Sequence, residues 1–308
     1  MAHQAEPIAA TAYQAEAGGE APDLGAFRAR VLAQGRALYR DLPWRRTTDP
    51  YEIWLSEVML QQTQVSRVDG RWQRWLERFP SVDALAAAQS ADVLAEWQGM
   101  GYNRRALALH RAAQTVAGTY GGVFPRDARE LEALPGIGPA TAAGILAFAF
   151  DLPGVYLETN VRAVFLHELF PGAAGVPDRE LVPLVRATCP ASADDPEDDP
   201  RTWYYALLDY GYELKRSGHN AARRSATHVR APKFEGSRRQ KRAELVRLLL
   251  AVRDGGAPGA PVEELAAGLS AVEREAGRAA VDLALVESIL SDLAKEGFCA
   301  QEGELWHV

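Results

Sequence analysis

Cysteine is scarce in this chain, with two among 308 residues, and its scarcity excludes several classes of protein. Cys189 and Cys299 lie far apart in the sequence and cannot build a disulfide framework, so we expect both thiols to be reduced. The sequence also lacks an apolar run that approaches the length needed to span a bilayer. Its first residues lack the basic segment followed by an apolar stretch that marks a secretory signal. We therefore expect a cytoplasmic protein without a membrane partner.

An excess of positive charge is lacking as well, because the formal net charge is -7 at pH 7. This total argues against binding of nucleic acid, but the distribution of charge argues for it. Between Lys215 and Arg242 lie ten basic residues and a single acid, Glu235. Charges are screened beyond roughly 8 Å at physiological salt, so DNA would respond to this local cluster rather than to the total. A solvated, flexible linker explains the cluster equally well at this point.

Strand patterns are absent from most of the chain, whereas apolar residues at helical spacing are frequent. Residues 1–23 are typical of a disordered tail. Residues 24–213 are a succession of helical patterns, which predicts an all-α domain. A basic segment, 214–237, leads into residues 238–308. There, three helices (238–252, 261–269 and 279–296) and a hairpin over 298–308 predict a small α+β domain that resembles a winged helix.

The segment 134–142 (LPGIGPATA) carries a first functional signal. Gly136 and Gly138 allow a tight turn, and Pro139 suits the first turn of the helix that follows. Free backbone N–H groups at such a helix start, with Thr141 beside them, suit a phosphate of DNA and ignore base sequence. A tight turn between two helices explains the same residues, but the full pattern favours DNA binding.

Two carboxylates stand in positions that suggest chemistry. Glu57 lies inside an apolar helical stretch, 50–65, and is followed by Gln61, Gln62 and Thr63, whose polar groups can both donate and accept. A surface role for Glu57 is the plain alternative. Glu158 lies just before a predicted helix, where the helix dipole favours an anion and Asn160 can cap.

Four segments together resemble the MutY-type adenine DNA glycosylases, a branch of the helix-hairpin-helix superfamily that includes endonuclease III. They are residues 42–44 (LPW), 56–65 (SEVMLQQTQV), 99–102 (GMGY) and 134–142. The resemblance spans about residues 42–211, and the glutamine-containing segment is specific to the MutY branch. It implies a two-lobed, all-α helix-hairpin-helix glycosylase fold that acts on double-stranded DNA, hence a nucleoid-associated protein.

The resemblance also implies roles for the two acids. Glu57 matches the acid that protonates the flipped base and later helps to activate water. Glu158 matches the carboxylate that stabilises the oxocarbenium-like sugar, so the surroundings of the two acids should push their pKa values apart. Asn160 matches an asparagine that supports the water and this carboxylate.

DNA-binding roles are implied in the same way. Gln62 and Thr63 match residues that wedge into the duplex around the orphan base, with Gln61 beside them. Tyr102 matches an intercalating tyrosine that fills the stack when the target base leaves.

Two departures from the family concern catalysis. The family usually has Asp at the position of Glu158, and one extra methylene moves the carboxylate by roughly 1.5 Å. Bifunctional relatives carry a Schiff-base lysine where this chain has Ala140, which has neither an amine nor the hydroxyl that MutY-type enzymes often place there. We expect a monofunctional glycosylase.

Two further departures concern accessory parts. The family commonly holds a 4Fe–4S cluster with four cysteines after the last glycosylase helix, but residues 214–220 contain none, so we expect no cluster and no other metal. The basic run would then order this loop, and we expect Arg216, Arg223 and Arg224 to contact phosphate. The C-terminal residues do not resemble the usual Nudix-like checking domain. Their last helix is acidic, which favours packing or a protein partner over reading of DNA.

We therefore predict a monomeric, monofunctional glycosylase without an iron–sulfur cluster that removes adenine mispaired with 8-oxoguanine or G. Two alternatives stay open. One is a glycosylase of the same fold that removes another mismatched or damaged base, such as a pyrimidine. The other is a DNA-binding homologue with altered catalysis, although retention of Glu57 beside the glutamines argues against it.

Overall fold

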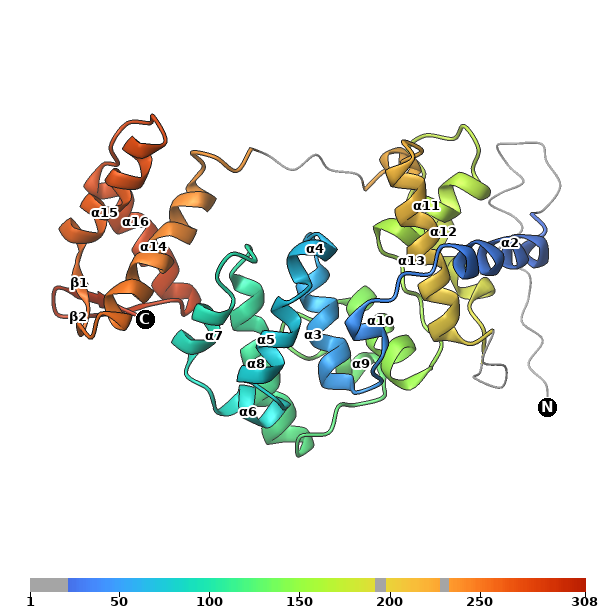
Figure 1. Ribbon diagram of the computed structural model, residues 1–308, viewed down its shortest axis with the longest axis horizontal. Helices are drawn as coiled ribbons and strands as arrows, with labels where there is room; N and C mark the ends of the chain where they lie inside the picture. Colours follow the sequence, from blue (N-terminus) through green and yellow to red (C-terminus); the bar gives the residue numbers. More distant parts are fainter. Residues whose placement is uncertain (1–21, 192–197, 228–232) are drawn as a thin grey trace. The chain divides into compact units, whose positions relative to one another are not determined.

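A computed structural model describes residues 22–191, 198–227 and 233–308 of the chain. Most of the predicted tail, residues 1–21, therefore lies outside the described residues, as do 228–232 of the basic segment. The chain forms two compact units. Figure 1 labels the helices and strands from which they are built. Unit 1 comprises residues 1–57, 125–133 and 137–230, and unit 2 comprises residues 58–124, 134–136 and 231–308.

Unit 1 is built from helices around one hydrophobic core. Its elements are α2 (Leu24–Ala37), the 3-10 turn η1 (Pro43–Arg45), most of α3 (Pro50–Leu60), α9 (Ala128–Glu132), α10 (Pro139–Phe150), α11 (Thr159–Glu168), α12 (Asp178–Thr188), α13 (Pro200–Arg216) and η2 (Ala221–Arg224). The helix α13 packs against both α2 and α11. Phe27, Phe165 and Trp203 are fully buried where these helices meet, and their rings make edge-to-face contacts.

Small residues let α13 approach its neighbours closely. A methyl group added at Gly35 of α2 would lie 2.3 Å from Cβ of Ala206 in α13. One added at Gly211 would lie 2.3 Å from the backbone oxygen of Asn160 in α11. The start of α11 is therefore held at a fixed distance from α13, which matters because α11 begins at one of the candidate carboxylates.

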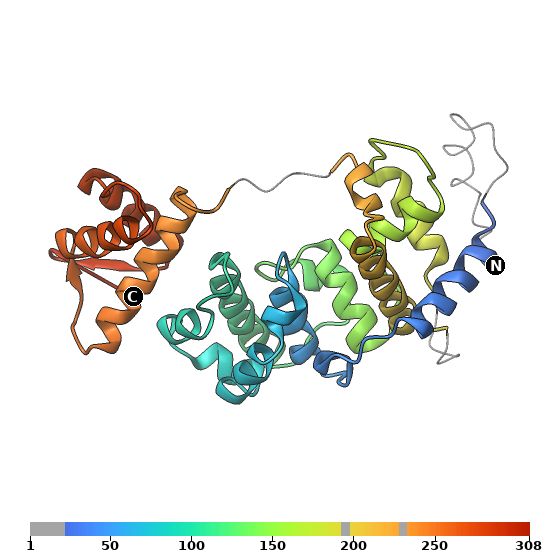
Figure 2. The same cartoon turned by 45° about the horizontal axis from the view of Figure 1, so that its top comes forward.

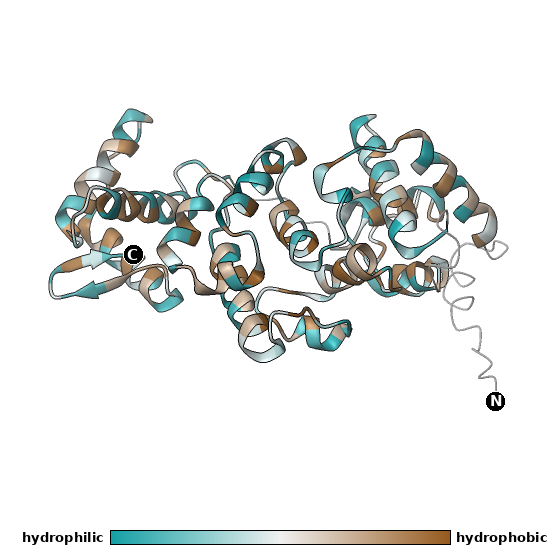
Figure 3. Ribbon diagram, turned by 60° about the horizontal axis from the view of Figure 1, so that its bottom comes forward, coloured by the Kyte–Doolittle hydropathy of each residue, from teal (hydrophilic) through white to brown (hydrophobic). Residues whose placement is uncertain are grey.

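Unit 2 has two parts along the chain. The first consists of α4 (Val65–Val68), α5 (Arg71–Arg78), α6 (Val82–Ala87), α7 (Ser90–Glu96) and α8 (Arg104–Tyr120). Trp75, Phe79 and Trp97 pack edge to face in its core, with ring centroids 5.1 Å and 5.6 Å from that of Trp75. Hydrophobic and hydrophilic residues alternate along the helices of the molecule, as expected for helices with one buried face (Figure 3).

The second part of unit 2 is the C-terminal domain. It consists of α14 (Arg238–Asp254), β1 (Ala260–Pro261), α15 (Val262–Glu275), α16 (Leu283–Glu296), β2 (Ala300–Glu302) and β3 (Leu305–His307). The strands form an antiparallel sheet in the order β1–β3–β2. Figure 2 shows this small sheet beside the helices of the domain. Three helices and a terminal hairpin are confirmed. The strand β1 escaped prediction because two residues, one of them proline, carry no alternating pattern.

The helical fold expected for residues 24–213 is confirmed, with two differences that bear on function. The helix expected over 50–65 is shorter, because α3 ends at Leu60 and Gln62 takes a φ of 53°, through which no right-handed helix continues. The cap of α11 is Glu158 rather than Asn160. In the described part of the chain, no helix is both long enough and apolar enough to cross a membrane.

Candidate active site

Glu57 lies near the end of α3 and is half-buried as a residue. Burial raises the pKa of Glu57 to about 8. A hydrogen bond from Tyr156 opposes this rise, and the negative charge of Glu158 adds to it. Glu57 therefore holds its proton at neutral pH and can donate it to a bound molecule.

The Glu57 carboxyl group lies against a glycine of α10. A methyl group added at Gly144 would lie 2.5 Å from Oε2 of Glu57 and 2.9 Å from Cε2 of Tyr156. The Tyr156 ring is buried between Phe148 and Tyr204, each in edge-to-face contact at a centroid distance of 5.3 Å. Gly144 thus provides the space in which the acid and the tyrosine meet, and the two aromatic neighbours fix the tyrosine ring.

Glu158 is the second carboxylate of the site and the N-cap of α11. One carboxylate oxygen accepts hydrogen bonds from the backbone N–H groups of Asn160 at 2.5 Å and Val161 at 2.9 Å. Burial raises the pKa of Glu158, while the two backbone donors, the positive charge of Lys215 and the Asn160 amide oppose this rise. The extra methylene of Glu158 therefore lets the carboxylate fold back onto the first turn of its own helix.

Asn160 supports this carboxylate, because its side-chain amide lies 3.3 Å from the other oxygen of Glu158. The amide oxygen of Asn160 is buried and accepts no hydrogen bond from any residue that the structure describes. A buried acceptor of this kind is suited to an ordered water. The structure brings Glu57, Glu158 and Asn160 together. The amide oxygen of Asn160 lies beside the carboxylate that caps α11.

The hairpin residues form a turn ahead of α10. Gly136 has a φ of 78°, and a methyl group added there would lie 2.7 Å from Cβ of Ala108, so both conformation and space require glycine. Gly138 is the extended N-cap of α10, no side chain caps that helix, and Pro139 occupies its first turn. Thr141 is buried, whereas Gly136 and Gly138 are exposed. Exposed backbone at a helix start is the feature that the predicted phosphate contact requires.

The predicted DNA-reading residues lie on two loops of unit 2, which we call the wedge loops: residues 61–63 and 99–102. Gln62 is exposed and Tyr102 is 44% exposed, and both have left-handed backbone conformations, with φ of 53° and 48°. Gln61 and Thr63 are half-buried. Non-glycine residues adopt this conformation rarely, and such strain concentrates at binding sites.

A single arginine of α8 holds the two wedge loops together. The guanidinium group of Arg105 donates to the backbone oxygens of Val58 and Gln61, each at 2.7 Å, and to the Thr63 hydroxyl at 3.1 Å. It also donates to the backbone oxygen of Gly101 at 3.2 Å. Burial lowers the pKa of Arg105 to about 10, so the group stays charged at neutral pH.

The basic segment contacts the protein itself more than we expected. Arg216 forms an ion pair with Glu213 at 2.7 Å. Arg224 donates to the backbone oxygens of Leu166 at 2.6 Å and Phe170 at 2.7 Å, which fastens η2 to the end of α11. Arg223 is exposed. Of the three arginines predicted to contact phosphate, Arg224 therefore has a structural role, and part of the guanidinium group of Arg216 is engaged by Glu213.

Sequence reasoning missed four residues of these sites. Tyr156, Gly144 and Lys215 were missed because their roles depend on contacts between segments far apart in the sequence. Arg105 lies three residues after the segment 99–102, at the start of a predicted helix. Its closeness to that segment was the one signal in the sequence that pointed to it. Among the described residues, no group of three or more histidine, cysteine or acidic side chains is placed to hold a metal ion.

Part of the chain is similar to known DNA repair proteins. Residues 55–195 match the family described as HhH-GPD superfamily base excision DNA repair protein. An adenine DNA glycosylase of Mycolicibacterium smegmatis is 43% identical over 175 residues, which are 56% of this chain and 57% of that protein. One of Mycobacterium tuberculosis is 42% identical over 135 residues, 44% of each protein. A solved thermostable thymine-DNA glycosylase is similar over 61% of this chain and 85% of its own, with 23% identity and a TM-score of 0.53.

These comparisons confirm the expected glycosylase fold, because the structural likeness extends over most of the solved protein. The chain spans about half the length of the curated relatives that it matches. The matched residues include Glu57, the wedge loops, the hairpin and Glu158.

Proposed function

We propose that this chain, whose residues 55–195 match the HhH-GPD superfamily of base excision DNA repair proteins, is an adenine DNA glycosylase acting on double-stranded DNA. The observation that carries the proposal is the pairing of Glu57, which holds its proton at neutral pH, with Glu158, whose carboxylate accepts two backbone N–H groups at the start of α11. The adenine DNA glycosylases at 42–43% identity indicate the base. Adenine mispaired with 8-oxoguanine or G is the substrate we expect.

Glu57 would act as the general acid. Its proton passes to the extruded adenine as the N-glycosidic bond breaks, and the bonding electron pair leaves with the base. A pKa of about 8 keeps most of the acid protonated at neutral pH, and the Tyr156 hydrogen bond stabilises the carboxylate that remains.

Glu158 and Asn160 would act on the sugar. Positive charge develops on the deoxyribose as the base leaves, and the anion of Glu158 stabilises it. A water held by the amide oxygen of Asn160 then adds to the sugar carbon, and Glu57, now a carboxylate, takes up the proton that the water releases. The step ends with an abasic site and free adenine.

The enzyme would be monofunctional. Ala140, at the start of α10, offers no amine for a Schiff base with the sugar. Lys215 is close enough for its charge to affect Glu158, so it is the amine to test. Borohydride should trap no covalent complex with DNA, and trapping that disappears in Lys215→Arg would contradict monofunctional action.

The residues after α13 do not fit an iron–sulfur cluster, which requires thiolate ligands. Residues 214–227 contain no cysteine, and the loop at η2 is instead fastened by Arg224 to carbonyl groups at the end of α11. We propose that the protein works without a cluster. Iron analysis of the purified protein tests this directly, since stoichiometric iron would contradict it.

An excision assay tests the function. The full chain is incubated with duplexes carrying A opposite 8-oxoguanine, A:G, T:G, U:G, hypoxanthine or oxidised pyrimidines, and alkali then reveals abasic sites. We expect excision of adenine alone. Excision only of pyrimidines would support the alternative glycosylase, and tight binding without excision would support a DNA-binding homologue.

Substitution of the acid sharpens this assay. Glu57→Gln cannot donate the proton and should lower the rate of excision by about 10²–10⁴-fold while DNA binding persists. The matched control is Glu77→Gln, which changes an exposed glutamate of α5 and should leave the rate unchanged. Equal rates in Glu57→Gln and the wild type would overturn the proposed mechanism.

A further inference from the structure

The segment that joins α10 to α11, residues 151–158, carries two groups of the candidate active site. We call it the connecting segment; it contains both Tyr156 and Glu158 and forms neither helix nor strand. In the part of the chain that the structure describes, residues 153–157 make no hydrogen bond from one backbone group to another. Because such bonds are lacking there, side chains must hold these residues in place.

One such side chain is that of Tyr204, which lies in α13 and is fully buried. Its hydroxyl group donates a hydrogen bond to the backbone oxygen of Gly154 and accepts one from the backbone N–H of Tyr156 at 3.2 Å. A hydroxyl group both donates and accepts, so it can hold these two backbone groups at once. The Tyr204 ring also packs edge to face on the Tyr156 ring, with centroids 5.3 Å apart.

The helix α13 gives this contact a firm base. It packs against α2 and α11, and Gly211 of α13 lies directly against the backbone of Asn160 at the start of α11. The same helix therefore holds the connecting segment near its middle, through Tyr204, and at its end, through the contact of Gly211 with α11.

Tyr156 in turn donates its phenolic hydrogen to Glu57. The other titratable groups that act on Glu57 are Glu158, in the same segment, and Tyr205 of α13. A hydrogen bond weakens steeply as its angle departs from the preferred one, so a small shift of the segment would weaken the bond to Glu57. The charged form of the acid would then lose stabilisation.

We propose that Tyr204 is a positioning residue for the acid: its hydroxyl group holds the connecting segment so that Tyr156 points its own hydroxyl group at Glu57. The proposal rests on the proposed function, in which Glu57 donates the proton. Because Tyr204 is fully buried, it does not touch the DNA, and it acts on the acid only through Tyr156.

Titration of Glu57 tests this role without requiring excision. The full chain is labelled with carbon-13 at the carboxyl group of glutamate, and the signal that Glu57→Gln removes is followed by NMR from pH 5 to 10. We expect a midpoint of about 8 in the wild type. In Tyr204→Phe the midpoint should rise by about half a unit or more, because the anion of Glu57 loses part of its hydrogen bond.

A double variant tests the route of this effect. If Tyr204 acts through Tyr156, removal of both hydroxyl groups should give the midpoint of Tyr156→Phe alone, to within about 0.2 unit. Two shifts that add would show that Tyr204 acts on Glu57 by another route, which would contradict the proposal.

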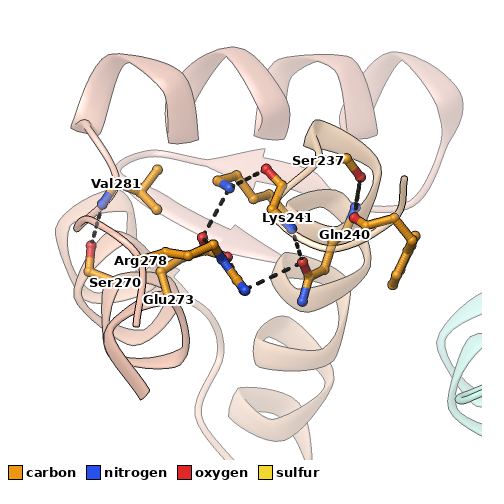
Figure 4. A network of polar contacts seen from close by, with 9 residues as sticks. Ser237, Gln240, Lys241, Ser270, Glu273, Arg278 and Val281 are labelled. Atoms are coloured by element: carbon orange, nitrogen blue, oxygen red, sulfur yellow. Dashed lines mark hydrogen bonds and ion pairs between the residues drawn. The ribbon is translucent and has the colours of Figure 1, made fainter. Parts of the chain in front are cut away.

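Arg278→Met is the control for a loss of stability in the other unit. Arg278 contacts the buried carboxylate of Glu273 at 2.6 Å, and Lys241 contacts the same carboxylate at 3.2 Å (Figure 4). Removal of one of these partners should lower the melting temperature and leave the midpoint of Glu57 unchanged. A rise equal to that in Tyr204→Phe would mean that any loss of stability moves the midpoint, and the proposal would fail.

Thermal melting verifies that Tyr204→Phe is folded. If it is not, Gly154→Ala acts on the same contact, because the added methyl group would lie 3.2 Å from Cβ of Ala143 and would displace the Gly154 carbonyl. Its midpoint should also rise. An unchanged midpoint in the variant that is folded would overturn the proposal. Failure of the wild type to excise adenine would contradict the proposed function, and the midpoints would still be measured.

Discussion

The phenolic hydroxyl of Tyr156 donates a hydrogen bond to the carboxyl group of Glu57. This bond favours the charged form of Glu57, because a neutral donor stabilises an anion more than a protonated acid. It therefore holds the pKa of the acid down to about 8, below the value that burial alone would give.

Removal of this hydroxyl should change the pH dependence of excision. In Tyr156→Phe the pKa of Glu57 rises, so the alkaline limb of the rate profile should move to higher pH by about one unit or more. The rate at pH 7 should fall about tenfold because the product carboxylate loses its donor. Single-turnover rates from pH 5 to 10 measure both effects.

A second tyrosine provides the control for this experiment. Tyr210 donates its hydroxyl to Glu168 in the same unit, so Tyr210→Phe removes a comparable bond away from the site. Its profile should match that of the wild type. An unshifted alkaline limb in Tyr156→Phe, with a normal melting temperature, would show that the bond does not tune the acid.

Gly144→Ala should reduce activity more than stability. The added methyl group would lie 2.5 Å from the Glu57 carboxyl oxygen, so the acid must move, and a displacement of about 1 Å can cost about 10²-fold in rate. Gly118 of α8 has open space at the same position, and Gly118→Ala should preserve activity and stabilise the helix by up to about 1 kcal/mol. Equal rates in the two variants would contradict the assigned role of Gly144.

Lys215→Met should move the acid limb of the rate profile to higher pH. The positive charge of Lys215 lowers the pKa of Glu158, so its removal raises that pKa and leaves less of the anion at low pH. Lys215→Arg keeps the charge and should restore the limb. A limb that stays in place in Lys215→Met would show that Glu158 is not the group whose ionisation limits the rate.

Arg105→Met should weaken DNA binding and lower the free energy of unfolding together. The substitution leaves the backbone oxygens of Val58 and Gln61 without their charged donor, at a cost of about 2–3 kcal/mol. Denaturant unfolding and anisotropy with an abasic duplex measure the two effects. Arg111→Met, on the exposed side of the same helix, should change neither by more than about 0.5 kcal/mol. If Arg105→Met is destabilised but binds DNA with full affinity, Arg105 does not support DNA binding through the wedge loops.

Local patterns were enough to predict much of this molecule. Apolar spacing located the helices, and the segments around Glu57 and residues 134–142 identified the fold and predicted Glu57 as the acid. The joint position of Glu57, Glu158 and Asn160 agrees with the roles that the family resemblance implied, although those roles await the excision assay.

What could not be predicted depends on contacts between distant segments. The charge cluster around Arg216 and Arg224 indicated DNA contact, yet its partners, Glu213 and the carbonyl groups of α11, become visible only when the chain is folded. Glu158 was predicted as the second carboxylate of the site. That it caps α11 could be seen only from the backbone geometry. The guanidinium carbon of Arg239 in α14 lies 5.6 Å from the centre of the Tyr102 ring, and this contact has no local signature because the two are separated by more than a hundred residues.

The carboxylate of Glu273 makes the stability of the C-terminal domain depend on pH. Its partners Arg278 and Lys241 lower its pKa in the folded domain, so it contributes stability above its unfolded pKa that is lost as pH falls through the folded one. Protonation would release α14 from α15, and the face that carries Arg239 would lose its fixed direction. A preparation eluted at low pH would thus contain a loosened C-terminal domain, so neutral handling suits any measurement of DNA affinity.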